Sequence, residues 1–141
     1  RPYAASLPEK AYYRPGIVQI GLDVPRHVLD ERIEARVDRM WADGFVEEVR
    51  RLEAAGLREG LTASRALGYA QVLRYLAGHG SEEEARAETV RATRRFARRQ
   101  GSWFRKDVRI AWLPFDAPDL LERAVAVVAA GVVGSTPTID G

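Results

Sequence analysis

The sequence predicts an α/β fold that is rich in helices and contains two strands of a parallel sheet. Two short, mostly apolar runs, residues 17–22 and 108–113, contain the β-branched side chains that are typical of buried strands. Several segments with helical periodicity separate these runs, so the two strands do not form a hairpin. Because two buried strands do not make a stable sheet alone, we expect the remainder of the sheet to be absent from these 141 residues.

The first helix is expected to begin near Pro25 and to end at Gly44. Asp23 is a candidate N-terminal cap, and a proline in the first turn removes no hydrogen bond, because that N–H has no partner there. Glycine is suited to the left-handed conformation that ends many helices. Apolar residues at three- and four-residue steps give this helix one buried stripe, which consists of Leu29, Ile33, Val37, Met40 and Trp41.

Three further helices follow before the second strand. The first spans about residues 45–55, and the second begins after Ser64 and continues to Gly78. The third has the clearest start signal, since Ser81 and Glu84 have the spacing of a capping box. We expect it to reach about residue 100, and a last amphipathic helix to cover residues 118–130. The domain prediction is therefore an extended lead-in, a single core and a flexible tail, at residues 1–16, 17–130 and 131–141.

Composition excludes several classes of site. The chain has no cysteine, so disulfides and thiolate metal sites are excluded, and its two histidines, His27 and His79, have no ligand-like spacing. No apolar run approaches the ~20 residues of a membrane span, and no signal peptide is evident, so a cytoplasmic location without membrane contact is expected. Motifs for an independent catalytic centre, such as a phosphate-binding GxxxxGK[ST] loop, are absent from the sequence.

Basic charge is concentrated in one segment. Residues 91–106 contain seven basic residues and no acidic one, and since the whole chain carries +2, the rest carries −5. The helical repeat places Arg91, Arg94, Arg95, Arg98 and Arg99 on one broad side, with Ala92, Phe96 and Ala97 nearer the side that packs. An amide and aromatic rings follow directly, at Gln100, Trp103 and Phe104. Guanidinium groups beside aromatic rings are typical of proteins that hold unstacked RNA.

The alternative for this segment is a solvent-exposed face whose arginines pair with glutamates. The available glutamates, Glu82, Glu83, Glu84 and Glu88, crowd the first half of the helix. They cannot neutralise its last two turns, so the sequence favours a nucleic-acid partner.

Two weaker features have both a functional and a structural interpretation. Arg32, Arg36 and Arg39 share one face of the first helix, where they can grip a diphosphate or simply pair with neighbouring acidic residues. By spacing alone the second interpretation is favoured. In the segment 64–71, Gly68 permits close backbone approach and Tyr69 can stack on a ligand, although a tyrosine packed against a neighbouring helix is the commoner outcome.

These segments together resemble the tRNA dimethylallyltransferase (isopentenyltransferase) family. The resemblance covers about residues 21–113, and its most specific pieces are Ala66-Leu67-Gly68-Tyr69, the helix Thr93 to Gln100 and Trp103-Phe104-Arg105. It implies the carboxy-terminal part of a P-loop-type α/β core, a fold of the ATP- and nucleotide-binding kind. It also implies transfer of a dimethylallyl group from dimethylallyl diphosphate to N6 of the adenosine 3′ of the tRNA anticodon, usually with Mg2+.

The resemblance also implies roles for individual residues. Arg36 matches an arginine on the diphosphate side of the reaction channel, and Arg32 precedes it by one turn. The positions that match tRNA-contacting regions are Arg65, Gly68, Tyr69, Gln71, Thr93, Arg94, Arg95, Phe96, Ala97, Arg98, Arg99, Gln100, Trp103 and Arg105. The chain departs from the family pattern at Gly101, which is expected to loosen the helix end.

The family places its P-loop and its catalytic aspartate in the amino-terminal half, which these 141 residues do not contain. The chain alone is therefore expected to be inactive, to lack Mg2+ ligands and to need that half as a partner. Two other functions stay open on the residues themselves. One is a non-catalytic RNA-binding helical module, and the other is a helical domain whose basic face meets an acidic protein.

Overall fold

The computed structural model describes residues 17–60 and 62–133, and the expected lead-in (1–16) and most of the expected tail (134–141) lie outside the described residues. The chain divides into two compact units. One unit contains both strands and the last helix, and the other consists of residues Val24–Lys106. The helix-rich composition with a parallel strand pair confirms the α/β class.

In the first unit, strand β1 (Gln19–Asp23) pairs in parallel with β2 (Ile110–Pro114), with Gln19 opposite Ile110 and Asp23 opposite Pro114. Gly21 lies opposite Trp112, and a Cβ at Gly21 would fall 2.7 Å from the indole ring. The glycine therefore makes room for the tryptophan side chain over the strand pair.

The apolar side chains of β1 are more exposed than a buried strand predicts. Ile20 and Leu22 are 37% and 52% exposed. These two residues are exposed because, in the described part of the chain, β1 has β2 as its one hydrogen-bonded neighbour.

Helix α5 (Leu120–Val133) continues past the predicted boundary at residue 130. Gly131 lies close to Val18, since a Cβ at Gly131 would overlap the valine side chain. A residue assigned to the flexible tail is therefore helical and packed in this unit.

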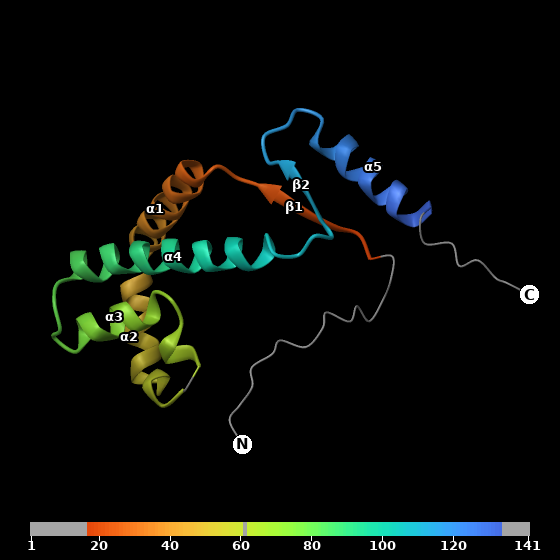
Figure 1. The fold of residues 1–141 in the computed structure, drawn as a ribbon. Coiled ribbons are helices and arrows are strands. Elements are labelled where there is room, and N and C mark those ends of the chain that lie inside the picture. The colour runs from red at the N-terminus through yellow and green to blue at the C-terminus, as the bar shows by residue number, and fades with distance from the viewer. Residues whose placement is uncertain (1–16, 61, 134–141) are drawn as a thin grey trace, which may run out of the picture. The chain divides into compact units, whose positions relative to one another are not determined.

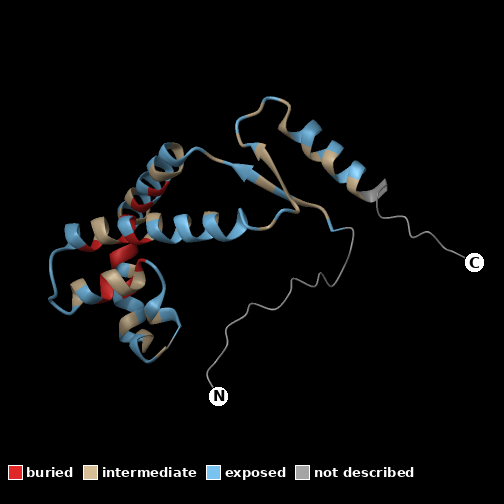
Figure 2. Cartoon of the chain, viewed as in Figure 1, coloured by how far each residue is buried: buried red, intermediate tan, exposed pale blue. Residues whose placement is uncertain are grey.

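The second unit consists of four helices: α1 (Arg26–Ala42), α2 (Phe45–Ala54), α3 (Tyr69–Leu76) and α4 (Glu82–Phe104). Two short 3-10 helices, η1 (Leu57–Glu59) and η2 (Ala63–Arg65), connect α2 to α3. The long helix α4 contacts both α1 and α3 (Figure 1). Buried residues gather where these helices meet, whereas the second half of α4 is mostly exposed (Figure 2).

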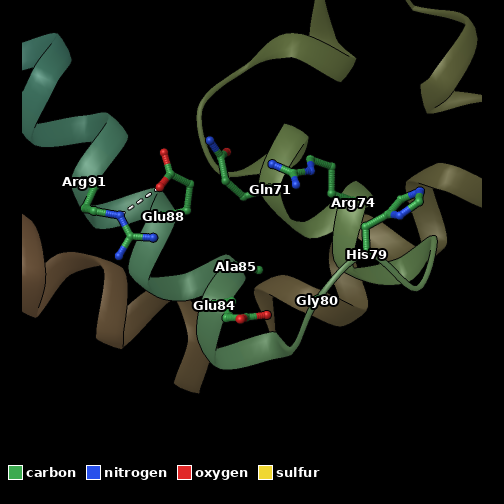
Figure 3. Close-up of a pocket in the computed structure, with 8 residues that line it drawn as sticks. All are labelled: Gln71, Arg74, His79, Gly80, Glu84, Ala85, Glu88 and Arg91. Atoms are coloured by element: carbon green, nitrogen blue, oxygen red, sulfur yellow. Dashed lines mark hydrogen bonds and ion pairs between the residues drawn. The ribbon is translucent and has the colours of Figure 1, made fainter.

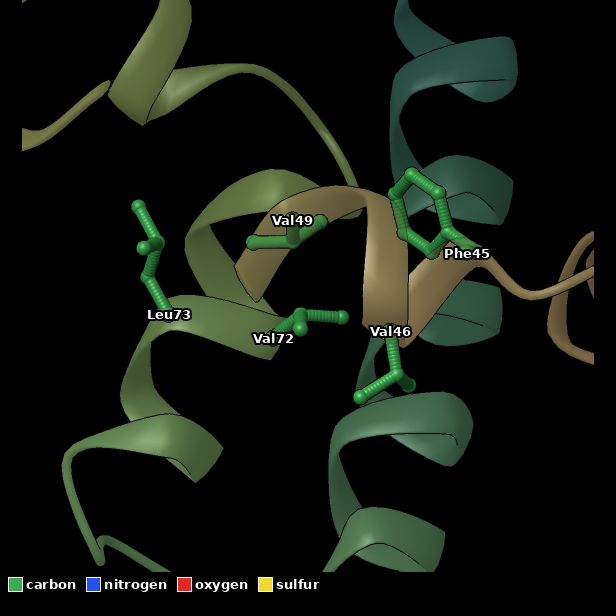
Figure 4. Packing of buried hydrophobic residues seen from close by; sticks show 5 residues of the cluster. All are labelled: Phe45, Val46, Val49, Val72 and Leu73. Carbon is green, nitrogen blue, oxygen red and sulfur yellow. The ribbon is translucent and has the colours of Figure 1, made fainter. Parts of the chain in front are cut away.

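Two apolar clusters stabilise the second unit. The larger one joins α2 to α3 and consists of Phe45, Val46, Val49, Val72 and Leu73 (Figure 4). The smaller one joins α1 to α4 through Ile33, Val37 and Val90, so the predicted stripe of the first helix does face the interior. Truncating a fully buried member such as Val49 would cost roughly 1–3 kcal/mol, in line with other losses of buried methyl groups.

Three predicted helix ends are wrong. Asp23 does not cap α1, because it belongs to β1 and the cap residue is Pro25, which has no side-chain cap bond. Helix α3 begins at Tyr69 and not at Arg65, since Ala66 is extended and Gly68 has a φ of 89°. Helix α4 continues through Gly101 to Phe104, because one glycine in a helix interior costs only about 1 kcal/mol.

The predicted capping box at the start of α4 is confirmed. The backbone N–H of Glu84 donates to the Ser81 hydroxyl at 3.1 Å, and the backbone N–H of Ser81 donates to the Glu84 carboxylate at 2.7 Å. Both side chains therefore satisfy backbone N–H groups that the helix itself leaves without partners.

Candidate functional site

The last turns of α4 expose two arginines without carboxylate partners. Glu88 pairs with Arg91 at 2.8 Å and with Arg95 at 2.7 Å, so one glutamate serves both. The hydrogen bonds from Arg95 and then Arg91 hold the pKa of Glu88 below its usual value. Among the described residues, no carboxylate pairs with Arg98 or Arg99, and both are exposed. The positive charge of this helix is thus concentrated near its carboxy-terminal end.

Aromatic rings lie beside these arginines. The Trp103 and Phe104 rings are 5.0 Å apart and nearly perpendicular, and Trp103 is 70% exposed. Phe96 was expected nearer the packed side, but it is 42% exposed, and the Arg99 guanidinium lies 5.9 Å from its ring centre. Exposed rings next to unpaired cations suit the stacking and phosphate contacts of single-stranded RNA.

Arg94 differs from the other arginines of this helix, because it binds α1. Its guanidinium donates to the Glu34 carboxylate at 2.6 Å and to the Asp30 carbonyl oxygen at 3.1 Å. A second bridge joins the same helices, from Arg86 to the Asp38 carboxylate at 2.7 and 3.0 Å. Arg94 is therefore part of a helix–helix contact, although the sequence places it in the RNA-contacting row.

The same bridges change the interpretation of the arginine row on α1. The neighbouring acidic residues expected to pair with that row are Glu31, Glu34 and Asp38, and two of these carboxylates, Glu34 and Asp38, bind α4 instead. Arg39 donates to the Ala35 carbonyl oxygen at 3.3 Å. Arg36 is exposed and has no ion pair within the part of the chain that the structure describes. Its charge is therefore available to an anionic ligand.

Two contacts hold the segment 65–69 against α2, and a third lies between the turn and α3. The Tyr69 hydroxyl donates to Glu48 at 2.6 Å, its ring packs edge-on against Phe45, and the Gln71 amide oxygen accepts from the Gly68 N–H at 2.9 Å. The hydrogen bond to Glu48 raises the pKa of Tyr69. Tyr69 thus packs against a neighbouring helix, while Arg65 stays exposed.

Two groups of predicted site residues meet in one surface pocket. Arg36 and Tyr69 line it together, although they are distant in the sequence. The other lining residues are Met40, Asp43, Phe45, Glu48 and Leu67. The exposed arginines of α4 do not line this pocket, so the structure separates them from Arg36 and Tyr69.

A comparison with protein families decides what this chain is related to. A family model described as IPP transferase matches residues 1–107, which is more than half of the chain. The chain belongs to the IPP transferase family.

Individual members of the IPP transferase family agree with this assignment. A tRNA dimethylallyltransferase of Thermobifida fusca is 67% identical over 127 residues, which cover 90% of this chain and 40% of that protein. A tRNA dimethylallyltransferase of a Nocardioides species is 59% identical over 141 residues, covering 100% of the chain and 43% of that protein. The chain thus spans about two fifths of the length of these relatives.

Solved structures support the fold of this IPP transferase chain. The tRNA isopentenylpyrophosphate transferase of Bacillus halodurans matches with a TM-score of 0.79 and 32% identity, over 84% of this chain and 40% of that one. The corresponding protein of Staphylococcus epidermidis matches with a TM-score of 0.72 and 28% identity, over 84% and 38%. The family resemblance seen in the sequence motifs is confirmed.

The IPP transferase chain has a further pocket that its sequence does not predict. It lies between α3 and α4, and Arg74 and His79 contribute to it together with the predicted site residue Gln71 (Figure 3). No spacing pattern in the sequence indicates this pocket, because its lining comes from separate elements. Its carboxylates, Glu84 and Glu88, already bind the Ser81 N–H and two arginines.

Two further findings concern metal ions and membranes. Within residues 17–60 and 62–133, no three histidine, cysteine, aspartate or glutamate side chains cluster as metal ligands would. In the same ranges, no helix has the length and apolar character needed to cross a membrane.

Proposed function

We propose that this chain supplies the tRNA-contacting and diphosphate-side residues of a tRNA dimethylallyltransferase. The observation that carries the proposal is the carboxy-terminal half of α4, where no described carboxylate forms an ion pair with Arg98 or Arg99, beside the exposed Trp103. Guanidinium groups of this kind bind phosphates, and an exposed indole stacks on a base. Membership of the IPP transferase family supports the substrate class.

In the proposed reaction, the N6 amine of an adenosine 3′ of the anticodon attacks the allylic carbon of dimethylallyl diphosphate. A C–N bond forms, the C–O bond to diphosphate breaks, and N6 loses one proton to the aspartate that the family places in its amino-terminal half. The adenine must leave the anticodon stack to reach the donor. Arg36 would stabilise the charge that develops on the departing diphosphate, with Arg32 one turn away.

We expect Mg2+ to bind with the diphosphate and to neutralise part of its charge. The described residues offer no cluster of carboxylates for it, so its ligands would come from the diphosphate, water and the amino-terminal half. We further propose that the 141-residue chain transfers no prenyl group alone and that the reaction is cytoplasmic.

The test uses a chimera, in which this chain replaces the aligned part of the Thermobifida fusca relative; we call it the fusca chimera. The chimera should transfer labelled dimethylallyl groups to a tRNA anticodon stem-loop. The isolated chain should bind the stem-loop weakly and transfer none. Transfer by the isolated chain would contradict the proposed division of roles.

A second candidate function is a non-catalytic RNA-binding module. Arg98, Arg99 and Trp103 all lie on α4, and none of them lines the pocket that contains Arg36. RNA binding therefore does not depend on a donor site in this geometry. A fusca chimera that folds and binds the stem-loop without transferring a prenyl group would favour this candidate.

A further inference from the structure

Helices α1 and α4 are joined by charged bridges as well as by apolar packing. Ile33, Val37 and Val90 form the apolar part of this contact. The Arg94 guanidinium and the Arg86 guanidinium each reach a carboxylate on α1. These bridges cross between segments that are 60 and 48 residues apart in the chain. They are therefore tertiary contacts and not the usual pairing of neighbours on one helix.

Arg94 is slightly more buried than Arg86, whose side chain is 35% exposed. The Arg94 side chain is 30% exposed and contacts both Glu34 and the backbone of Asp30. Arg26 donates in return to the Arg94 carbonyl oxygen at 3.3 Å. The Arg94 Nε and Asp30 Oδ1 atoms are both buried, 3.9 Å apart. A tRNA phosphate would compete with Glu34 for this guanidinium, whereas Arg99 is exposed and has no competing carboxylate among the described residues.

The bridged carboxylates lie on either side of Arg36 in the sequence. Glu34 precedes Arg36 by two residues and Asp38 follows it by two. Two residues correspond to about 200° of helical rotation, so Arg36 lies on the face of α1 opposite the bridges. There it lines the pocket that also contains Tyr69. Together with the apolar contacts of Ile33 and Val37, the bridges fix the rotation of α1 about its axis, and that rotation determines where Arg36 lies.

We infer that Arg94 is a positioning residue, which holds α1 and thereby Arg36 in place through Glu34 and Asp30, and that it does not bind a tRNA phosphate. This inference rests on the proposed function, because it assigns the role of Arg36 to prenyl transfer. A misplacement of about 1 Å in a reacting group can lower a rate by about 10²-fold. The consequence should appear in the rate of transfer and not in the affinity for tRNA.

Glu34 separates the two roles that Arg94 can have. If Arg94 bound a phosphate, Glu34→Ala would release it and remove a negative charge, and stem-loop binding would tighten. If Arg94 positions α1, Glu34→Ala and Arg94→Ala remove the same bridge. Both should then lower kcat to a similar extent, and the double variant should lower it little further.

The experiment measures transfer kinetics and the salt dependence of stem-loop binding for the fusca chimera and three variants, Arg94→Ala, Glu34→Ala and the double variant. Arg99→Ala is the matched control on the same helix. We expect Arg94→Ala to lower kcat by about 10-fold or more, up to about 10²-fold, with an unchanged salt slope. Arg99→Ala should lower the log–log slope by ~0.7 to ~0.9.

A slope reduction in Arg94→Ala equal to that of Arg99→Ala would overturn the inference, and so would tighter binding with unchanged kcat in Glu34→Ala. If Arg94→Ala does not fold, Glu34→Gln still tests the bridge, because the Glu34 side chain is 58% exposed and the amide keeps its shape. A parent chimera without transfer would refute the proposed function, and the salt slopes would still test whether Arg94 binds phosphate.

Discussion

The Tyr69 hydroxyl donates a 2.6 Å hydrogen bond to the Glu48 carboxylate and so ties the first residue of α3 to α2. This bond fixes one end of the segment 65–69, whose other contacts are the Gly68 N–H bond to Gln71 and the close approach of Gly68 to Phe45. An exposed segment that is anchored in this way presents its remaining side chains in one arrangement. If this segment contacts RNA as proposed, little conformational freedom is left to lose on binding.

Tyr69→Phe removes the hydroxyl and should lower the free energy of unfolding by about 1 kcal/mol, the usual net value of a hydrogen bond. The pKa of Tyr69 is raised in the folded state, so the bond stabilises fully below the unfolded value of about 10. This contribution is lost as the pH rises through the folded pKa. Urea unfolding of the fusca chimera from pH 8 to 11 measures it. Equal loss of stability above pH 10 in wild type and variant would contradict this prediction.

Gly68→Ala should lower the free energy of unfolding through two effects, backbone strain and a clash with Phe45. Comparison with Gly44→Ala separates these two effects. The φ of 89° at Gly68 disfavours any side chain, and a Cβ would lie 2.9 Å from the Phe45 ring. Gly44 has a φ of 91° with no atom within 4 Å of a Cβ, so Gly44→Ala should cost only the backbone strain, about 1–2 kcal/mol. Gly68→Ala should cost more than that by about 1–3 kcal/mol.

Gly101→Ala is the control for these two substitutions, because it is expected to stabilise the chain. Gly101 lies inside α4, and a Cβ there meets no atom within 4 Å. Alanine at this position should raise the free energy of unfolding by up to about 1 kcal/mol, because glycine loses more backbone entropy in a helix. Thermal melts of the three variants rank them. Equal costs for Gly44→Ala and Gly68→Ala would show that the ring contact carries no strain.

Glu88→Gln should tighten stem-loop binding and steepen its salt dependence. Glu88 pairs with Arg91 and Arg95, so neutralising it releases two guanidiniums beside the unpaired arginines. Each additional phosphate contact steepens the log–log slope by ~0.7 on single strands. Glu82→Gln, on the first turn of the same helix, removes the same charge without releasing these arginines and is the control. An unchanged slope in Glu88→Gln would mean that the first half of this face does not meet RNA.

The pH dependence of stability gives a separate measurement on Glu88. Its folded pKa lies below the unfolded value, so its stabilising effect is present above about pH 4–5 and is lost as the pH falls through the folded pKa. Wild type should therefore lose more stability on acidification than Glu88→Gln. Parallel acid unfolding curves would show that Arg91 and Arg95 do not favour the ionised carboxylate.

Arg36→Ala in the fusca chimera should lower prenyl transfer by about 10²-fold or more, as does removal of one preorganised charge stabiliser. Stem-loop affinity should stay nearly the same, because Arg36 lines a pocket apart from the exposed arginines of α4. Arg39→Ala is the matched control on the same helix, since Arg39 donates to the Ala35 backbone. Equal loss of binding and transfer in Arg36→Ala would move Arg36 to the RNA surface.

Local signals in the sequence predicted local structure well. The capping box of Ser81 and Glu84 involves residues three apart, and the two β-branched runs indicate strands from their own composition. The start of α3 could not be predicted, because the conformation of Gly68 depends on the Phe45 ring from another helix. A glycine in the sequence can indicate a turn, but it does not show which ring the turn must approach.

The sequence predicted which residue types form the candidate site. It did not predict which residues those side chains contact. The excess of arginine over acid identified the last turns of α4 as a cationic surface. The partner of Arg94 is 60 residues away, so helical spacing cannot reveal that this arginine turns towards α1. Likewise, Arg36 and Tyr69 share a pocket only because the turn before α3 is held against α2.

The parallel pairing of β1 with β2 has a consequence for how this chain folds. Gln19 pairs with Ile110, so the entire helical unit is an insertion between two neighbouring strands. Closing a flexible loop of about 90 residues costs roughly 4 kcal/mol in chain entropy, which a pair of five-residue strands cannot readily repay. Once the helices have folded, most of that entropy has already been lost. The strand pair should therefore form last, after the folded helices have brought the two ends of the insertion close together.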